Sequence, residues 1–211
     1  MKKIAVFVSG GGSNLQALMD AITDGYIKDA SIVVVVSNKK EAYGLERAVK
    51  SGIDTLFLDP KDFKNAQEYD KNLAEKMNAL KIDIVCLAGY MKILKPIFLE
   101  VFKGKVLNIH PALLPSFGGE GCYGLHVHEK VLEAGVKVTG VTVHFVDEGA
   151  DTGPIILQKT VEVSDEDTPE SLQKKVLKYE HESYKEALKY VVQDRVSING
   201  KKTYIKPSGK I

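Results

Sequence analysis

An amide and an imidazole stand two residues apart in the segment VLNIHPALLPSF (residues 106–117), where Asn108 and His110 interrupt an apolar run. Side chains two residues apart in a strand lie on the same face, and Pro111 and Pro115 prevent a helix from continuing the segment. An amide and a protonated imidazole on one face can stabilise an oxyanion on a tetrahedral carbon. The alternative is a structural pair, in which His110 is satisfied in a loop and Asn108 caps a turn.

A carboxylate follows a second apolar strand. In HFVDEGADTGP (residues 144–154), Asp151 comes just after the strand and before Gly153 and Pro154. An aspartate there can approach the sheet edge that carries His110, and its charge would favour the protonated ring, so we expect a raised imidazole pKa. The chain has no G-x-S-x-G nucleophile elbow. The cluster therefore predicts transfer of an acyl-type group to a nucleophilic substrate, without an acyl-enzyme.

The loop SGGGSN (residues 9–14) lies between a predicted strand and a predicted helix, where backbone N–H groups and the helix dipole favour an anion. A Walker A loop would need Gly-Lys-Ser/Thr at its end, and a dinucleotide fingerprint would need glycine at Leu15 and an acidic residue near Asn38. Neither condition is met. The loop predicts either a tight turn, with glycines for packing, or a phosphate monoester site formed by Gly11, Gly12, Ser13 and Asn14.

Three further histidines raise the question of a metal. His126 and His128 are close in sequence, with His110 or His144 available as a third ligand. Two histidines without a third ligand fixed by local spacing are weak evidence for a metal site, and we predict no metal. His144, inside TVHFV, is interpreted as a packed strand residue that lines the site, and the lysines of the C-terminal tail as a solvated face.

The elements that must position these residues follow an alternating pattern. Short β-branched runs predict strands, and longer amphipathic runs predict helices. We expect strands at residues 3–8, 31–38, 54–58, 83–89 and 105–110, and helices at 15–22, 41–52, 66–81 and from Pro96. Repeated strand–helix–strand units are typical of a doubly wound α/β fold with a mostly parallel sheet.

The pattern changes after residue 137. KVTGVTVHFV and PIILQKTVEV predict two long strands with a short connection, which favours antiparallel pairing. A long helix is expected at residues 168–192, with Thr168 as its cap and Pro169 in its first turn. The dipeptide Asn199-Gly200 between alternating runs predicts a C-terminal hairpin.

Composition limits the classes of function. With 211 residues the chain is long enough for one domain with a large core, and its net charge of +1 gives no reason to expect nucleic acid or an anionic membrane surface. Two cysteines are too few for a disulfide framework. The sequence has no apolar stretch of membrane-spanning length and no signal-peptide cleavage site. We therefore expect a soluble cytoplasmic protein that acts on small molecules.

Four segments carry a family resemblance: SGGGSNLQAL, LAGYMKIL, LNIHPALLPSF and HFVDEGADTGPII. Together and in this order they resemble the folate-dependent phosphoribosylglycinamide formyltransferase family of purine synthesis. The resemblance extends from residue 2 to about residue 190. The N-x-H-P-x-L-L-P segment is shared by formyltetrahydrofolate-using transferases and hydrolases in general, whereas the G-S-N loop is typical of the glycinamide ribonucleotide branch.

The resemblance implies a reaction and a site. In this family the amine of N1-(5-phospho-D-ribosyl)glycinamide attacks the formyl carbon of 10-formyltetrahydrofolate, a co-substrate, on a single Rossmann-like formyltransferase domain. By this resemblance residues 1–104 are the phosphate-binding half, and residues 105–211 are the catalytic and folate-binding half. The catalytic residues would be Asn108, His110 and Asp151, the phosphate loop Gly11, Gly12, Ser13 and Asn14, and the ribose ligand Glu180. The folate-binding residues would be Met91, Lys92, Ile93, Leu94, Asp147, Glu148, Gly149 and Ala150.

The sequence differs from the family pattern in residues 117–128, which are longer and richer in glycine than the usual link. Three rival functions remain at this point. A formyltetrahydrofolate hydrolase shares the catalytic residues but uses water, and usually has an additional N-terminal domain. A methionyl-tRNA formyltransferase would need a further C-terminal domain and a basic surface. A flavodoxin-like phosphate-ligand binder would use Asn108 and His110 only as structural residues.

Overall fold

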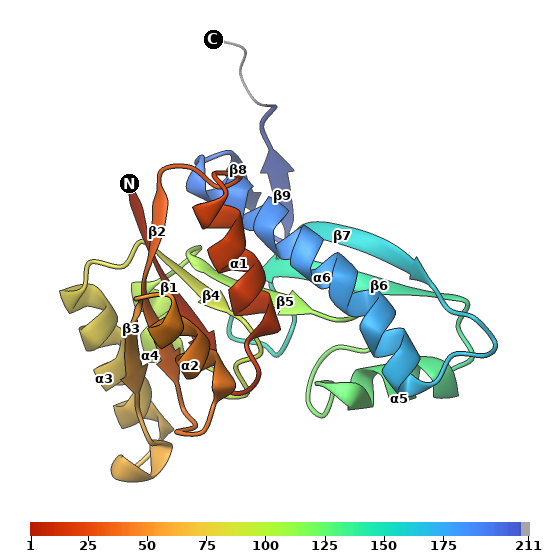
Figure 1. Ribbon diagram of the computed structural model, residues 1–211, viewed down its shortest axis with the longest axis horizontal. Coiled ribbons are helices and arrows are strands. Elements are labelled where there is room, and N and C mark those ends of the chain that lie inside the picture. The colour runs from red at the N-terminus through yellow and green to blue at the C-terminus, as the bar shows by residue number, and fades with distance from the viewer. Residues whose placement is uncertain (208–211) are drawn as a thin grey trace. The chain divides into compact units, whose positions relative to one another are not determined.

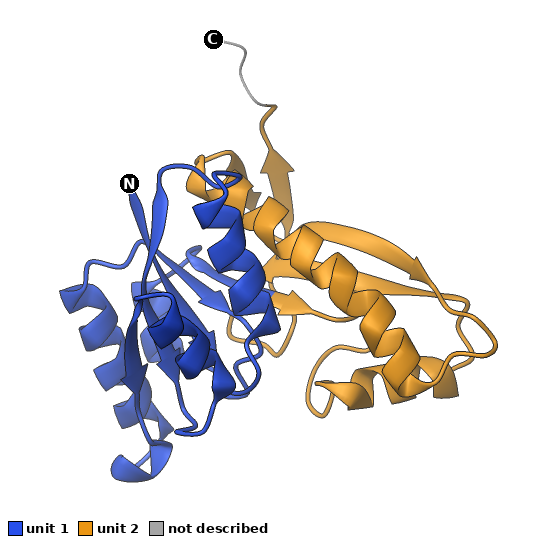
Figure 2. Cartoon of the chain, in the orientation of Figure 1, with its two compact units in different colours: residues 1–108 blue, residues 109–211 orange. Residues whose placement is uncertain are grey.

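The computed structural model describes residues 1–207. Its main sheet is mostly parallel, with the strand order β3-β2-β1-β4-β5-β6-β7, and β8 and β9 pair with each other (Figure 1). The chain divides into two compact units, Met1–Asn108 and Ile109–Ile211 (Figure 2). This boundary falls within β5, a few residues after the predicted division between residues 104 and 105.

The first unit is a parallel α/β arrangement. Its strands are β1 (Lys2–Val8), β2 (Ala30–Ser37), β3 (Asp54–Phe57), β4 (Ile84–Leu87) and β5 (Val106–His110), whose last two residues belong to the second unit. Its helices are α1 (Ser13–Thr23), α2 (Tyr43–Lys50), η1 (Pro60–Asp62), α3 (Ala66–Ala79) and α4 (Pro96–Val101). All strand pairs here are parallel. The apolar part of β1, from Ile4 to Val8, and the whole of β4 are buried because helices cover such a sheet on both faces.

The second unit is built around an antiparallel pair. It contains α5 (Leu125–Glu133), β6 (Val138–Phe145), β7 (Ile155–Glu162), α6 (Pro169–Val192), β8 (Val196–Asn199) and β9 (Lys202–Ile205). The β6–β7 register shifts at His144, which pairs with Ile155 after Val143 pairs with Leu157, so β7 carries one extra residue there. Such a bulge changes the direction of side chains at a sheet end.

Sequence periodicity predicted most of these elements. The parallel strands, the antiparallel pair, the long helix and the C-terminal hairpin are confirmed, with boundaries shifted by at most two residues. Thr168 caps α6 in a reciprocal pair with Ser171, whose N–H donates to the Thr168 hydroxyl at 3.2 Å. Helix α5 was not predicted, because its sequence follows a glycine-rich stretch and Gly124 at its start has a φ of 56°.

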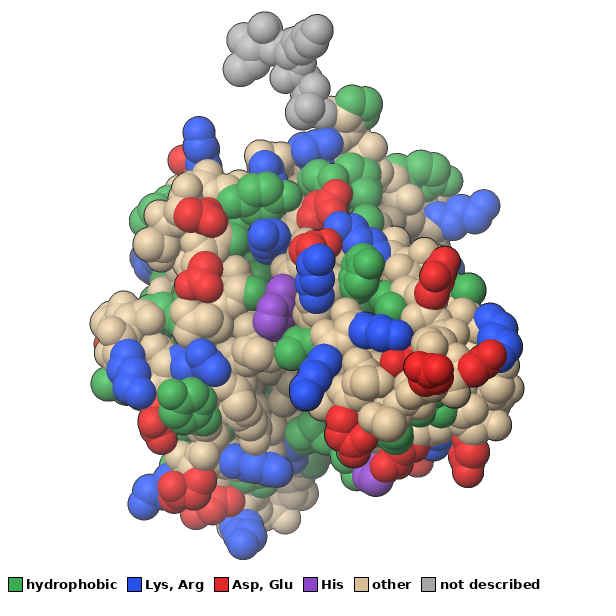
Figure 3. Space-filling model, turned by 45° about the vertical axis from the view of Figure 1, so that its right-hand side comes forward, with side chains coloured by type: hydrophobic (Ala, Val, Ile, Leu, Met, Phe, Trp, Pro, Cys, Tyr) green, Lys and Arg blue, Asp and Glu red, His purple; other side chains and the backbone are tan. Residues whose placement is uncertain are grey.

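The surface agrees with the balanced composition. On the face drawn in Figure 3, basic and acidic side chains are interspersed. Within residues 1–207, no helix has the length and apolar composition needed to cross a membrane. Cys86 is buried in β4, Cys122 is half-buried, and neither is part of a disulfide.

Candidate active site

The glycine loop after β1 depends on Gly12 for two reasons. Its φ of 70° lies in the left-handed region that favours glycine, and a Cβ there would lie 2.8 Å from the Cα of Gly44. Gly12 is also the N-cap of α1, and as a glycine it has no side chain with which to cap the first turn. The first-turn N–H groups and the helix dipole therefore favour an anion beside Ser13 and Asn14.

Arg47 on α2 fixes this loop from the side. Its Nε donates to the Gly11 carbonyl oxygen at 2.8 Å, and its Nη1 donates to the Gln16 side chain at 3.0 Å. The neighbouring Gly44 N–H donates to the Gly10 carbonyl oxygen at 2.9 Å. Sequence reasoning missed Arg47, because nothing in the local pattern of α2 links it to a loop 36 residues earlier.

The segment Met91–Leu94, expected to bind folate, is fixed at both ends within the first unit. The Met91 N–H donates to the Ser9 hydroxyl at 2.8 Å, and the Lys95 N–H donates to the carboxylate of Asp70, a fully buried residue on α3. Met91 and Ile93 are 44% and 49% exposed, respectively. The two anchors therefore hold an apolar segment at the surface, although neither Ser9 nor Asp70 was predicted as part of the site.

The second unit brings His110 and Asp151 together as predicted, and adds His144. The Nδ1 atom of His110 lies 3.5 Å from one Asp151 carboxylate oxygen, and Nε2 of His144 lies 3.6 Å from the other. Both imidazoles are at least 96% buried, and the carboxylate is 16% exposed. His144 is thus a packed strand residue, as expected, but it also contacts the carboxylate directly.

The segment after Pro115 supplies two backbone contacts to this cluster. Nε2 of His110 donates to the Phe117 carbonyl oxygen at 2.8 Å, because a carbonyl can only accept. The Gly119 N–H donates to Asp151 at 3.1 Å. Nδ1 of His110 is therefore the nitrogen that gains or loses the second proton, and it faces Asp151. No motif in the sequence indicates that residues 117–119 hold His110 and Asp151 in place.

Burial decides the charge of His110. Desolvation lowers the pKa of the His110 imidazole and outweighs the opposing effects of the Asp151 carboxylate and the Phe117 hydrogen bond. The expected rise in the His110 pKa is therefore wrong. Burial alone would raise the pKa of Asp151, but the contacts with His144, His110 and Gly119 hold it below its ordinary value. At neutral pH the pair is a neutral ring beside an ionised carboxylate.

The other predicted residues are distributed over both units. Asn108 lies on β5 in the first unit and is half-buried. Residues 147–150 form the loop after β6, and Glu180, 8% exposed, lies on α6. Both belong to the second unit.

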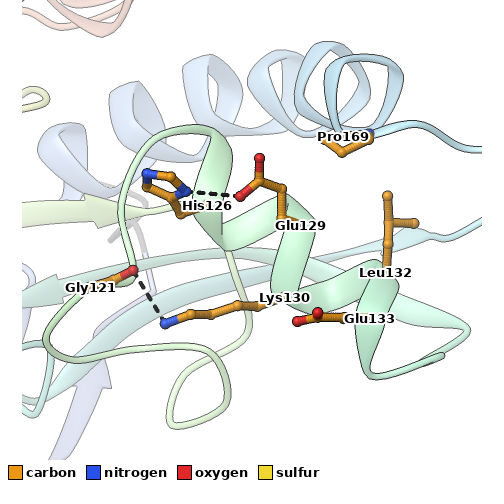
Figure 4. A pocket seen from close by; sticks show the side chains of 7 residues that line it. All are labelled: Gly121, His126, Glu129, Lys130, Leu132, Glu133 and Pro169. Atoms are coloured by element: carbon orange, nitrogen blue, oxygen red, sulfur yellow. Dashed lines mark hydrogen bonds and ion pairs between the residues drawn. The ribbon is translucent and has the colours of Figure 1, made fainter.

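The structure separates the two histidines of the H-V-H motif. Both lie on α5, where residues two apart do not face each other. His126 is exposed beside a surface cavity of about 670 Å³ and contacts Glu129 at 2.8 Å (Figure 4), whereas His128 is 1% exposed. Within residues 1–207, no group of three His, Cys, Asp or Glu residues is arranged to hold a metal ion.

We expect His128 to make the protein acid-sensitive. Desolvation by burial, followed by the charge of His110, lowers the His128 pKa to about 4. Between this value and the unfolded value of about 6.5, the unfolded chain binds a proton that the folded chain does not. The free energy of unfolding should therefore fall by roughly 3 kcal/mol between pH 6.5 and pH 4.

Urea unfolding at several pH values tests this expectation in His128→Gln, with His126→Gln as the exposed control on the same helix. The His128→Gln protein should lose less stability on acidification than the wild type, whereas the control should lose as much as the wild type. Equal pH dependence in all three proteins would contradict the assignment of this buried neutral ring.

The chain is similar in sequence and in fold to proteins of one known family. Residues 2–188 match the model of the formyl transferase family. The chain is 40% identical to the phosphoribosylglycinamide formyltransferase of Haemophilus influenzae, a match that covers 97% of this chain and 94% of that protein. The crystal structure of glycinamide ribonucleotide transformylase 1 from Symbiobacterium toebii matches with a TM-score of 0.92 and 44% identity, covering 97% of this chain and 94% of that chain.

Some relatives are much longer. The trifunctional purine biosynthetic protein adenosine-3 of Drosophila melanogaster is 43% identical over 199 residues, but this chain spans 14% of its length. The family model and the two full-length matches agree with one another. The chain therefore belongs to the formyl transferase family, and the relatives that it covers almost end to end are phosphoribosylglycinamide formyltransferases.

Proposed function

We propose that this chain transfers the formyl group of 10-formyltetrahydrofolate to the amine of N1-(5-phospho-D-ribosyl)glycinamide. The observation that carries the proposal is the buried imidazole–carboxylate pair formed by His110, the last residue of β5, and Asp151, in the loop after β6. Such a pair can move a proton and stabilise charge, but it supplies no nucleophile, which agrees with attack by a substrate amine. Two relatives that match over nearly their full length, at 40% and 44% identity, are named for formyl transfer to glycinamide ribonucleotide, which supports this choice of substrates.

The neutral resting state of His110 suggests its part in the reaction. The substrate nitrogen attacks the formyl carbon, the new N–C bond forms, and the formyl oxygen becomes an oxyanion that Asn108 stabilises. Nδ1 of His110 accepts the proton released by the attacking nitrogen, and the Asp151 carboxylate stabilises the resulting imidazolium. The bond between the formyl carbon and the folate nitrogen then breaks, and that nitrogen receives the proton from His110. No acyl-enzyme forms.

The remaining predicted residues are assigned to binding. The first-turn amides of α1 with Gly11, Gly12, Ser13 and Asn14 would hold the phosphate monoester, because they supply neutral donors at a helix N-terminus. Glu180 would accept from the ribose hydroxyls. The folate would be bound by residues 91–94 and 147–150. A cytoplasmic location and the absence of metal and nucleic acid from the reaction remain predictions.

An absorbance assay of tetrahydrofolate formation tests the proposed function. Purified protein is supplied with 10-formyltetrahydrofolate, with and without glycinamide ribonucleotide. We expect turnover that requires the ribonucleotide and saturates with it. Equal turnover without it would indicate a hydrolase, and no turnover under either condition would indicate a non-catalytic binding protein.

A further inference from the structure

The C-terminal hairpin is tied to the loop that carries Asp151. Lys201, in the turn between β8 and β9, donates from Nζ to the Asp147 carboxylate at 2.8 Å and to the Thr152 carbonyl oxygen at 2.7 Å. These two acceptors stand at the two ends of residues 147–152. A single ammonium group therefore joins both ends of the loop, so this lysine is not simply part of a solvated face.

The loop adds its own bonds to this closure. The Thr152 hydroxyl donates to the Asp147 carboxylate at 2.6 Å, and the Gly149 N–H donates to the same oxygen at 3.2 Å. Burial alone would raise the pKa of Asp147, but the bonds from Lys201, Thr152 and Gly149 lower it. The carboxylate is thus ionised and accepts hydrogen bonds from three donors at the base of the loop.

The backbone at Asp151 needs such support. Its φ of 58° is in the left-handed region, which residues other than glycine rarely adopt, although aspartate and asparagine adopt it more often than most. Gly153, two residues later, is constrained in a different way: no larger residue fits there, because a Cβ would lie 1.8 Å from the Phe145 carbonyl oxygen. The conformation that directs Asp151 at His110 and His144 is therefore set by the closure of the loop around it.

The hairpin is itself anchored within the second unit. The Thr203 hydroxyl donates to the Ile155 carbonyl oxygen at 2.6 Å. At the open end of the hairpin, Arg195 Nε donates to the Lys206 carbonyl oxygen at 2.8 Å, and the Lys206 N–H donates to the Arg195 carbonyl oxygen at 2.9 Å. Lys201 thus projects from a fixed support, which makes it suited to hold a loop in one conformation.

We propose that Lys201 is a positioning residue of the active site, which closes the 147–152 loop and so orients Asp151 and the loop backbone toward the folate. The role in folate binding rests on the proposed function, whereas the closure of the loop does not. Lys201 is 71% exposed and Asp147 33% exposed. An ion pair so exposed contributes little to global stability, so its effect should be local.

The test compares Lys201→Met with Lys202→Met, since Lys202 is the adjacent exposed lysine of β9. Hydrogen exchange followed by mass spectrometry should show faster exchange of the peptides that cover residues 146–153 in Lys201→Met. Both variants should melt at the wild-type temperature. Exchange in this loop at the same rate in both variants would overturn the proposal.

Kinetics then separate positioning from a purely structural contact. In Lys201→Met, kcat/KM for the folate should fall between about 10- and 100-fold, as for a displaced catalytic group, and the KM for the ribonucleotide should not change. Asp147→Asn should have a similar effect, and the double variant should lose less than the sum of the two single losses, because Lys201 and Asp147 share one ion pair. Additive losses, or equal changes in both KM values, would contradict the proposal.

An inactive wild-type protein would instead refute the proposed function and leave the exchange result to decide the loop closure.

Discussion

Replacing Asp151 with asparagine is expected to lower kcat by roughly 10²- to 10⁴-fold, the range in which general acid–base groups contribute. The substitution removes the charge that stabilises an imidazolium at His110, but it keeps the side-chain volume. Asparagine is also one of the few residues that tolerate a left-handed φ such as the 58° of Asp151. The variant should therefore fold normally. A thermal melt checks its folding, and stopped-flow turnover measures the loss in kcat.

The pH dependence of this variant has a defined direction. Burial lowers the His110 pKa, and Asp151 partly opposes that effect. Without the carboxylate the His110 pKa should fall further, so the acid limb of the kcat/KM profile should move to lower pH. An NMR titration of His110 measures the pKa without turnover. Asp165→Asn, an exposed carboxylate of the same unit, is the control. A His110 pKa equal in the wild type and in Asp151→Asn would refute the electrostatic coupling.

Replacing Asn108 with alanine is expected to lower kcat by about 10²- to 10³-fold, the typical cost of one lost oxyanion donor. The side chain is half-buried in the middle of β5, so its loss should leave the fold intact. Asn78→Ala, an exposed amide on α3 in the same unit, is the control. A variant of Asn108 that is unfolded, or that keeps full activity, would support the structural reading of this residue instead.

Local sequence patterns predicted the fold well because strands and helices are encoded by periodicity. The runs around Val35 and Leu87 are uniformly apolar and lie in buried strands, and the Asn-Gly dipeptide marks the observed hairpin. Helix α5 was not predicted, because the glycines before Leu125 hid its beginning. The antiparallel pairing of β6 with β7 followed from the change of pattern near residue 138.

The site was predicted less completely, for reasons of distance and burial. Motif position identified His110 and Asp151, and the structure places their side chains 3.5 Å apart. Contacts from distant segments, such as those of Arg47 and Lys201, leave no local signal in the sequence. The pKa of His110 was predicted with the wrong sign because a sequence shows which charges can come near a ring, but not how deeply the ring is buried.

The most direct test of the proposed reaction follows the formyl carbon itself. The protein is supplied with glycinamide ribonucleotide and 10-formyltetrahydrofolate labelled with ¹³C in the formyl group, and ¹³C NMR identifies the product. We expect the label to move to the glycinamide nitrogen, in an amount equal to the tetrahydrofolate formed. Release of the label as formate, at the same rate with or without the ribonucleotide, would contradict it.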